Sequence, residues 1–189
     1  MEEIKSRRRS GIKAFLIVLP TASGKSRIVE EDIRDFAKDR KTFKALILAP
    51  GIDILLDWKK RIEMELPELV DKIEIRTYAY IARHYTEFPA DYYNYLVVDE
   101  AHHAVAPVLK RVIQYFDTEF MIGITATDQR PDKKKLETVF GTYSTSLSLT
   151  DAMKQGIIAT ANVYRIETNI DLSQIRFNGK DYVLSLIHI

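Results

Sequence analysis

Two polar motifs each follow directly on an apolar run, and their order along the chain constrains the fold more than any other feature of the sequence. The first follows the apolar run at 14–19 and reads Pro20-Thr21-Ala22-Ser23-Gly24-Lys25-Ser26. The second follows the run at 95–98 and reads Asp99-Glu100-Ala101-His102. Apolar runs of this length are typical of parallel strands buried on both faces, which carry their polar groups at the carboxyl ends. The two motifs therefore predict a mostly parallel α/β sheet with a polar site at one edge.

The rest of the chain repeats the same alternation of strand-like and helical patterns. Strands are predicted at about 14–19, 44–49, 72–76, 94–99 and 120–125, because β-branched and large apolar residues gather there. Helices are predicted at 25–38, 52–66 and 105–116. In the second helix one face carries Leu55, Trp58, Ile62 and Leu66; in the third the residues expected to face the core are Val108, Leu109, Val112, Ile113 and Phe116. The pattern predicts one α/β domain over 1–149, with helices on both faces of the sheet.

The residue types in the two motifs indicate phosphate and metal chemistry. A Gly-Lys-Ser loop that opens a helix presents backbone N–H groups to phosphate oxygens, and its Lys25 adds a positive charge that we expect to be exposed in the empty loop. The Ser26 hydroxyl and the Asp99 carboxylate can ligate Mg²⁺, and Glu100 can orient or deprotonate a water. A buried Asp99 without a cation would cost several kcal/mol. Together the motifs indicate half of a nucleotide-hydrolysis site.

Composition limits the other possibilities. The 189 residues are 46% apolar and 29% charged, which is ordinary for a folded domain, and the net charge of +1 makes no global case for a polyanion partner. The chain has no cysteine, so it has no disulfide framework and no zinc–thiolate site. The longest apolar run near the start is too short to span a membrane. We therefore expect a cytoplasmic protein with no membrane partner.

The motifs resemble those of superfamily 2 helicases and translocases, specifically the DEAD/DEAH-type ATPases with restriction-enzyme-like motor domains. Residues 20–26 and 99–102 resemble motifs I and II, and Gly123-Ile124-Thr125-Ala126-Thr127 resembles motif III. Leu46-Ile47-Leu48-Ala49-Pro50 is similar to motif Ia, and Ile75-Arg76-Thr77-Tyr78 to motif Ib. The resemblance covers about 12–131 and implies the RecA-like fold of a P-loop NTPase, here the first of two motor domains.

The resemblance also implies roles for individual residues. Lys25 and Glu100 would be catalytic, and ATP would be bound by Pro20, Thr21, Ala22, Ser23, Gly24, Lys25 and Ser26. Mg²⁺ would be held by Ser26 and Asp99. Coupling of nucleotide state to the track would pass through His102, Thr125, Ala126 and Thr127. The nucleic-acid backbone would be contacted by Pro50, Gly51, Thr77, Tyr78 and Arg130, the first four through main-chain and hydroxyl groups. The implied partners are nucleic acid, with DNA favoured over RNA, and a second RecA-like domain in the full-length protein.

Other interpretations of these residues remain open at this point. The phosphate loop could serve a P-loop switch or kinase without a track, or a module that binds nucleotide without hydrolysing it. A guanine-reading Asn-Lys-x-Asp motif is missing from the sequence, and the Thr-Ala-Thr loop would have no role in a switch. His102 and His103 could be metal ligands, but no third ligand is evident. Arg130 could equally be a solvated side chain.

Three further segments carry weaker expectations. The basic clusters Lys5-Ser6-Arg7-Arg8-Arg9 and Lys133-Lys134-Lys135 are expected to be solvated surface rather than phosphate contacts. The tyrosines are expected to pack within the fold rather than form a stacking platform for bases; these are Tyr85, Tyr92, Tyr93 and Tyr95. Residues 150–183 are expected to begin the linker to the second motor domain, with a capped helix at 150–156 and a strand at 162–168.

Both ends of the chain carry expectations of their own. The last six residues, 184–189, match one reading frame of a sequencing adapter and are expected to be an artefact. Met1 is expected to be an internal start, preceded in the full-length protein by further sequence.

Overall fold

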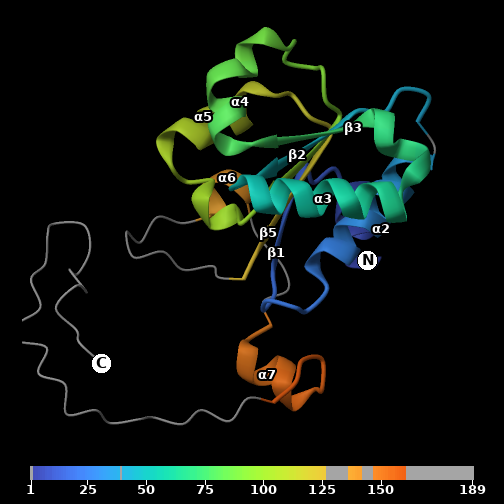
Figure 1. Cartoon of the computed structure of the whole chain (residues 1–189), viewed down its shortest axis with the longest axis vertical. Helices are drawn as coiled ribbons and strands as arrows, with labels where there is room; N and C mark the ends of the chain where they lie inside the picture. The colour runs from blue at the N-terminus through green and yellow to red at the C-terminus, as the bar shows by residue number, and fades with distance from the viewer. Residues whose placement is uncertain (1, 39, 127–135, 142–146, 161–189) are drawn as a thin grey trace, which may run out of the picture. The chain divides into compact units, whose positions relative to one another are not determined.

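Five parallel strands form one sheet in the computed structural model, which describes residues 2–38, 40–126, 136–141 and 147–160 (Figure 1). The strands are β1 (Ala14–Val18), β2 (Ala45–Ala49), β3 (Ile73–Thr77), β4 (Tyr95–Asp99) and β5 (Phe120–Thr125), arranged in the order β1-β5-β4-β2-β3. Each strand lies within one residue of its predicted bounds. The predicted α/β, RecA-like sheet is confirmed, and every strand pair in it is parallel.

Helices cover both faces of this sheet. They are α1 (Glu2–Arg9), α2 (Lys25–Lys38), α3 (Ile52–Glu65), α4 (Tyr78–His84), α5 (Pro107–Tyr115), α6 (Glu137–Phe140) and α7 (Leu149–Lys154), with short 3₁₀ turns at Pro67–Lys72, Tyr85–Glu87 and Ala101–His103. Alternate residues of each strand pack on opposite faces. In β4, Tyr95 and Val97 join one core with α1, α2 and α3, whereas Leu96 and Val98 join a second core with α4, α5 and α6. Burial on both faces explains why the strands read as continuous apolar runs.

The predicted helices are present, with two differences in detail. Val108 was expected to face the core but is 57% exposed, whereas the next residue, Leu109, is 5% exposed and packs in the core. The helix expected at 150–156 covers Leu149–Lys154, and its cap is Ser148, whose hydroxyl accepts a hydrogen bond from the Asp151 N–H at 3.0 Å. Tyr93 and Tyr95 are fully buried, as expected for packing residues.

Several expectations fall outside the described residues. These are Thr127, Arg130, the lysines at 133–135, the strand at 162–168 and the terminal segment 184–189. The described residues up to Ala159 belong to one compact unit, Met1–Ala159. No helix in the described ranges is both long enough and apolar enough to cross a membrane.

The N-terminal basic cluster is not the solvated surface that its composition suggested. Arg8 forms hydrogen bonds of 2.9 and 2.7 Å to the two carboxylate oxygens of Asp32 on α2, and a third of 3.1 Å to Asp35. Lys5 also binds Asp35, at 2.8 Å. Asp32 is completely buried and accepts a further hydrogen bond from the Tyr95 hydroxyl at 2.6 Å. The cluster thus fastens α1 to the helix that follows the phosphate loop.

We expect Arg8→Ala to destabilise the domain by about 3–5 kcal/mol, because it leaves a buried carboxylate without its cation. Burial already raises the pKa of Asp32, against the lowering effects of Tyr95 and Arg8, and losing Arg8 raises it further. A carboxyl group with a raised folded-state pKa favours folding when protonated, so the defect should shrink as the pH falls through that pKa. Urea unfolding at neutral and acidic pH measures both effects. Arg9→Ala, at the exposed neighbouring position, is the control; an equal loss in both variants would contradict the prediction.

Candidate active site

The strand order brings the three predicted motifs to one edge of the sheet. Strand β5 lies between β1 and β4, and the paired residues at the carboxyl ends are Val18 with Thr125 and Asp99 with Ile124. The Gly-Lys-Ser loop follows β1, the Asp-Glu pair ends β4, and the Thr-Ala-Thr loop ends β5. Motifs distant in sequence therefore meet because their strands are neighbours.

The phosphate loop has the backbone of an anion cradle. Gly24 has a φ of +87° and directly precedes the 14-residue helix α2, and a Cβ added to it would meet nothing within 4 Å. Ala22 also has a positive φ, of +63°, a conformation that costs a non-glycine residue about 1–2 kcal/mol. The Ser23 hydroxyl donates to the Pro20 carbonyl at 2.6 Å. The loop is therefore open on the side where a Gly24 Cβ would stand.

Lys25 is folded back onto its own loop rather than exposed, contrary to the sequence expectation. Its ammonium donates hydrogen bonds of 2.9 Å to the carbonyls of Leu19 and Pro20. Burial lowers the pKa of Lys25, while the charges of Glu100 and Asp99 act in the opposite direction. The lysine of the first motif therefore interacts electrostatically with both carboxylates of the second.

Asp99 is held by contacts that sequence reasoning missed. Its Oδ2 accepts a hydrogen bond of 2.8 Å from the indole Nε1 of Trp58 on α3, and its Oδ1 accepts one of 2.8 Å from the Glu100 N–H. Burial raises the pKa of the Asp99 carboxyl, and these two donors lower it. In the sequence, Trp58 is visible only as part of an apolar helix face, which predicts burial but not a polar partner.

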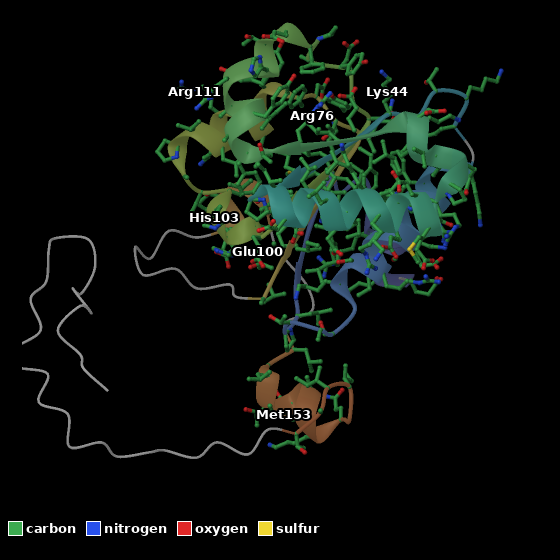
Figure 2. All side chains as sticks on the ribbon, viewed as in Figure 1. Lys44, Arg76, Glu100, His103, Arg111 and Met153 are labelled. Atoms are coloured by element: carbon green, nitrogen blue, oxygen red, sulfur yellow. The ribbon has the colours of Figure 1, made fainter. Side chains whose placement is uncertain are left out.

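Glu100 and His102 occupy the turn after β4. Glu100 has a φ of +47°, a strained conformation for a non-glycine residue and one that is frequent at functional sites. His102 Nδ1 lies 3.2 Å from a Glu100 carboxylate oxygen and 3.1 Å from the Thr125 hydroxyl. The structure thus brings Glu100, which was predicted to be catalytic, together with two of the predicted coupling residues, His102 and Thr125. Figure 2 shows Glu100 and His103 at the same edge, away from Lys44.

The residues predicted to contact nucleic acid lie nearby but differ in what they present. Pro50 and Gly51 lead into α3, and the Thr77 hydroxyl accepts a hydrogen bond of 3.2 Å from the Tyr80 N–H as the cap of α4. The Tyr78 hydroxyl donates to the main-chain carbonyl of Asp99, and burial raises its pKa well above the usual range. The Tyr78 hydroxyl therefore has an internal partner in this structure, and its contact with a phosphodiester backbone stays a prediction.

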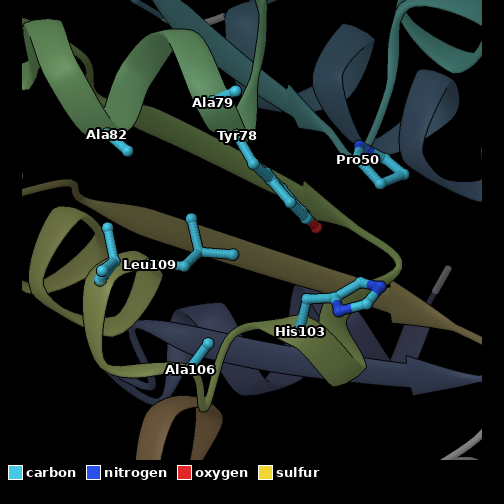
Figure 3. A pocket seen from close by; sticks show the side chains of 8 residues that line it. Pro50, Tyr78, Ala79, Ala82, His103, Ala106 and Leu109 are labelled. Atoms are coloured by element: carbon cyan, nitrogen blue, oxygen red, sulfur yellow. The ribbon is translucent and has the colours of Figure 1, made fainter. Parts of the chain in front are cut away.

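A hollow of about 340 Å³ lies beside Tyr78, between α4 and α5 (Figure 3). Pro50, His103 and small or apolar residues of the two helices line it. His103 also packs edge-on against Tyr78, with ring centroids 6.1 Å apart. Across the part of the chain that the structure describes, no group of three or more His, Cys, Asp or Glu side chains could hold a metal ion, so the alternative of a histidine metal centre gains no support.

A parallel sheet with a Gly-Lys-Ser loop after β1 and an Asp-Glu-Ala-His turn after β4 defines a RecA-like domain of the P-loop NTPase class. The profile of the family described as "Type III restriction enzyme, res subunit" matches this chain over residues 1–79 and 70–130. The chain belongs to that family. It carries the N-terminal, helicase-type motor domain of superfamily 2.

Curated relatives agree with this assignment. The chain is 28% identical over 147 residues to the DNA 3'-5' translocase XPB2 of Sulfurisphaera tokodaii, an alignment that covers 70% of this chain and 32% of XPB2. It is 23% identical to a subunit of the type I restriction enzyme EcoAI of Escherichia coli, over 86% of this chain and 23% of that subunit. The chain therefore spans about a third or less of the length of these relatives.

Solved structures share the fold. The helicase domain of Hef from Pyrococcus furiosus superposes with a TM-score of 0.59 at 21% identity, over 76% of this chain and 37% of that one. The SWI2/SNF2 ATPase core of Sulfolobus solfataricus, solved in complex with double-stranded DNA, gives a TM-score of 0.57 at 18% identity, over 74% and 33% of the two chains.

Proposed function

We propose that this chain is the first motor domain of an ATP-dependent DNA helicase or translocase and that its site binds Mg·ATP for hydrolysis. The observation that carries the proposal is the placement of the two motifs at one edge of the sheet, with the Gly-Lys-Ser loop after β1, the Asp-Glu pair at the end of β4, and β5 between these two strands. A switch protein would need the same phosphate loop. The contact of His102 with Thr125 at the end of β5 favours a motor, because it ties the acidic motif to a third loop.

The residues of the site fit a nucleoside triphosphate. The N–H groups at the start of α2 are available to an anion, and the helix dipole favours negative charge there. The Lys25 ammonium donates to two carbonyls of its own loop, which an anionic phosphate can replace as partners. Ser26 and Asp99 would hold Mg²⁺, which when bound offsets charge on the phosphate oxygens. Glu100 would accept a proton from the attacking water at its carboxylate.

We infer that residues 1–149 form this motor domain and that 150–183 lead toward a second one, since the alignments with this chain cover only 32% of XPB2 and 37% of the Hef helicase domain. In the complete protein the second domain would supply the other wall of the cleft. It would also supply an arginine finger, which is worth about 10³–10⁵ in rate in related phosphoryl-transfer enzymes.

We therefore expect the 189-residue chain to bind Mg·ATP weakly, to turn it over little, and to show almost no stimulation by DNA. Calorimetry with ATP, and phosphate release with and without double-stranded DNA, provide the test. Failure to bind ATP in the presence of Mg²⁺ would overturn the proposed function. A robust, DNA-stimulated ATPase would instead mean that one domain holds a complete site, and the two-domain motor would have to be abandoned.

A further inference from the structure

Two residues outside the acidic motif at 99–102 form hydrogen bonds with Asp99. The Trp58 indole N–H binds one oxygen of its carboxylate at 2.8 Å, and the Tyr78 hydroxyl binds its main-chain carbonyl. Trp58 is 1% exposed, so water does not compete for its N–H group. Each carboxylate oxygen can accept two hydrogen bonds or ligands, and the protein supplies one donor to each. Asp99 thus has a fixed orientation and retains acceptor capacity for a cation.

Trp58 and Tyr78 lie on the two helices that follow the loops predicted to contact nucleic acid. Trp58 lies on α3, whose N-cap is Gly51, and Tyr78 is the first residue of α4 after its Thr77 cap. If the loop at Gly51 or the loop at Thr77 moved, the movement would therefore reach Asp99 through a short helical segment and one hydrogen bond. His102 and Thr125, by contrast, reach the site from the other side of the acidic motif.

We propose that Trp58 and Tyr78 are positioning residues that clamp Asp99, side chain and main chain, in the orientation that ligates Mg²⁺. The inference rests on the proposed function, because it assumes that Asp99 is a metal ligand. Donors that orient a metal-binding carboxylate commonly change metal affinity by 10–100-fold when removed. A tryptophan that merely filled the core would affect folding stability and leave the metal dependence of nucleotide binding unchanged.

Trp58→Phe tests the clamp, because it keeps a buried aromatic ring and removes the donor. The affinity for a non-hydrolysable ATP analogue is measured by calorimetry in saturating Mg²⁺ and in EDTA. We expect affinity in Mg²⁺ to fall about tenfold while affinity in EDTA stays within about twofold. Tyr78→Phe should lower the affinity for the ATP analogue in Mg²⁺ by about fivefold, because it removes one neutral hydrogen bond.

Tyr95→Phe is the matched control. It also removes a buried hydrogen bond to a carboxylate, that of Asp32 at 2.6 Å, but away from the motifs, so both affinities should match those of the unmodified chain. If the unmodified chain shows no Mg²⁺-dependent binding, the proposed function fails and the clamp with it. If that chain responds to Mg²⁺ and Trp58→Phe responds equally, the clamp alone is overturned.

A second measurement needs no substitution at Trp58. It is the only tryptophan in the chain, so intrinsic fluorescence reports directly on the surroundings of Asp99. We expect Mg²⁺, added to the chain already bound to the ATP analogue, to change the emission, and Asp99→Asn to abolish that change. Unchanged emission, while calorimetry registers Mg²⁺-dependent binding, would show that Trp58 does not sense the metal ligand.

Discussion

Lys25→Ala is expected to abolish ATP hydrolysis and to weaken Mg·ATP binding about 100-fold without unfolding the domain. The ammonium is the cation that the loop offers to phosphate, and one or two charge-assisted hydrogen bonds account for a loss of about 3 kcal/mol. Its present partners are two carbonyls of its own loop, so the cost to folding should be only about 1 kcal/mol. Calorimetry gives the affinity, and thermal unfolding gives the stability.

Lys60→Ala serves as the control for this variant, because Lys60 is an exposed lysine on α3. It should leave both affinity and stability unchanged. Nucleotide affinity that is equal in the Lys25 variant and the unmodified chain would remove the phosphate loop from the proposed site.

Substitutions of Asp99 and Glu100 should separate nucleotide binding from ATP hydrolysis. Glu100→Gln keeps the size of the side chain and removes the base, so it should bind Mg·ATP normally while the residual hydrolysis rate falls about 10²–10⁴-fold. Asp99→Asn should instead weaken the dependence of binding on Mg²⁺, since it removes the charge of the proposed metal ligand. Single-turnover phosphate release and calorimetry at graded Mg²⁺ concentrations distinguish the two effects.

Glu63→Gln, an exposed change on α3, controls for the loss of one negative charge and should alter neither quantity. The division of labour between the two carboxylates is contradicted if both acidic variants lose activity to the same extent and neither changes the Mg²⁺ dependence.

Local sequence predicted the elements of this domain well. The strands were recognisable because both of their faces are buried, which makes them continuous apolar runs, and α3 because its apolar residues recur at helical spacing until Pro67. The motifs at the strand ends were recognisable because phosphate binding needs a particular short arrangement of residues. Val108 shows the limit of periodicity, which predicted the core-facing side of α5 but not which residue of its first turn stays exposed.

Contacts between distant segments were less predictable. The run of basic residues at 5–9 suggested a solvated surface, yet Arg8 and Lys5 bind carboxylates on α2. Tyr78 was predicted to contact a nucleic-acid backbone, and the motif gave no sign that its hydroxyl donates to the main-chain carbonyl of Asp99. In each case the side chain is amphipathic or long, so composition leaves its direction open and the neighbouring element decides it.

The sequence by itself determined the class of fold, the order of the elements and the identity of the phosphate and acidic motifs, because these depend on interactions within a few residues. Only the tertiary structure decided the strand order that places β5 between β1 and β4. It also decided that Lys25 folds onto its own loop and that Trp58 and Tyr78 donate hydrogen bonds to Asp99. Those features depend on which surfaces pack together once the sheet forms. Hydrogen bonds between buried groups then follow from that packing, since an unpaired buried donor or carboxylate is costly.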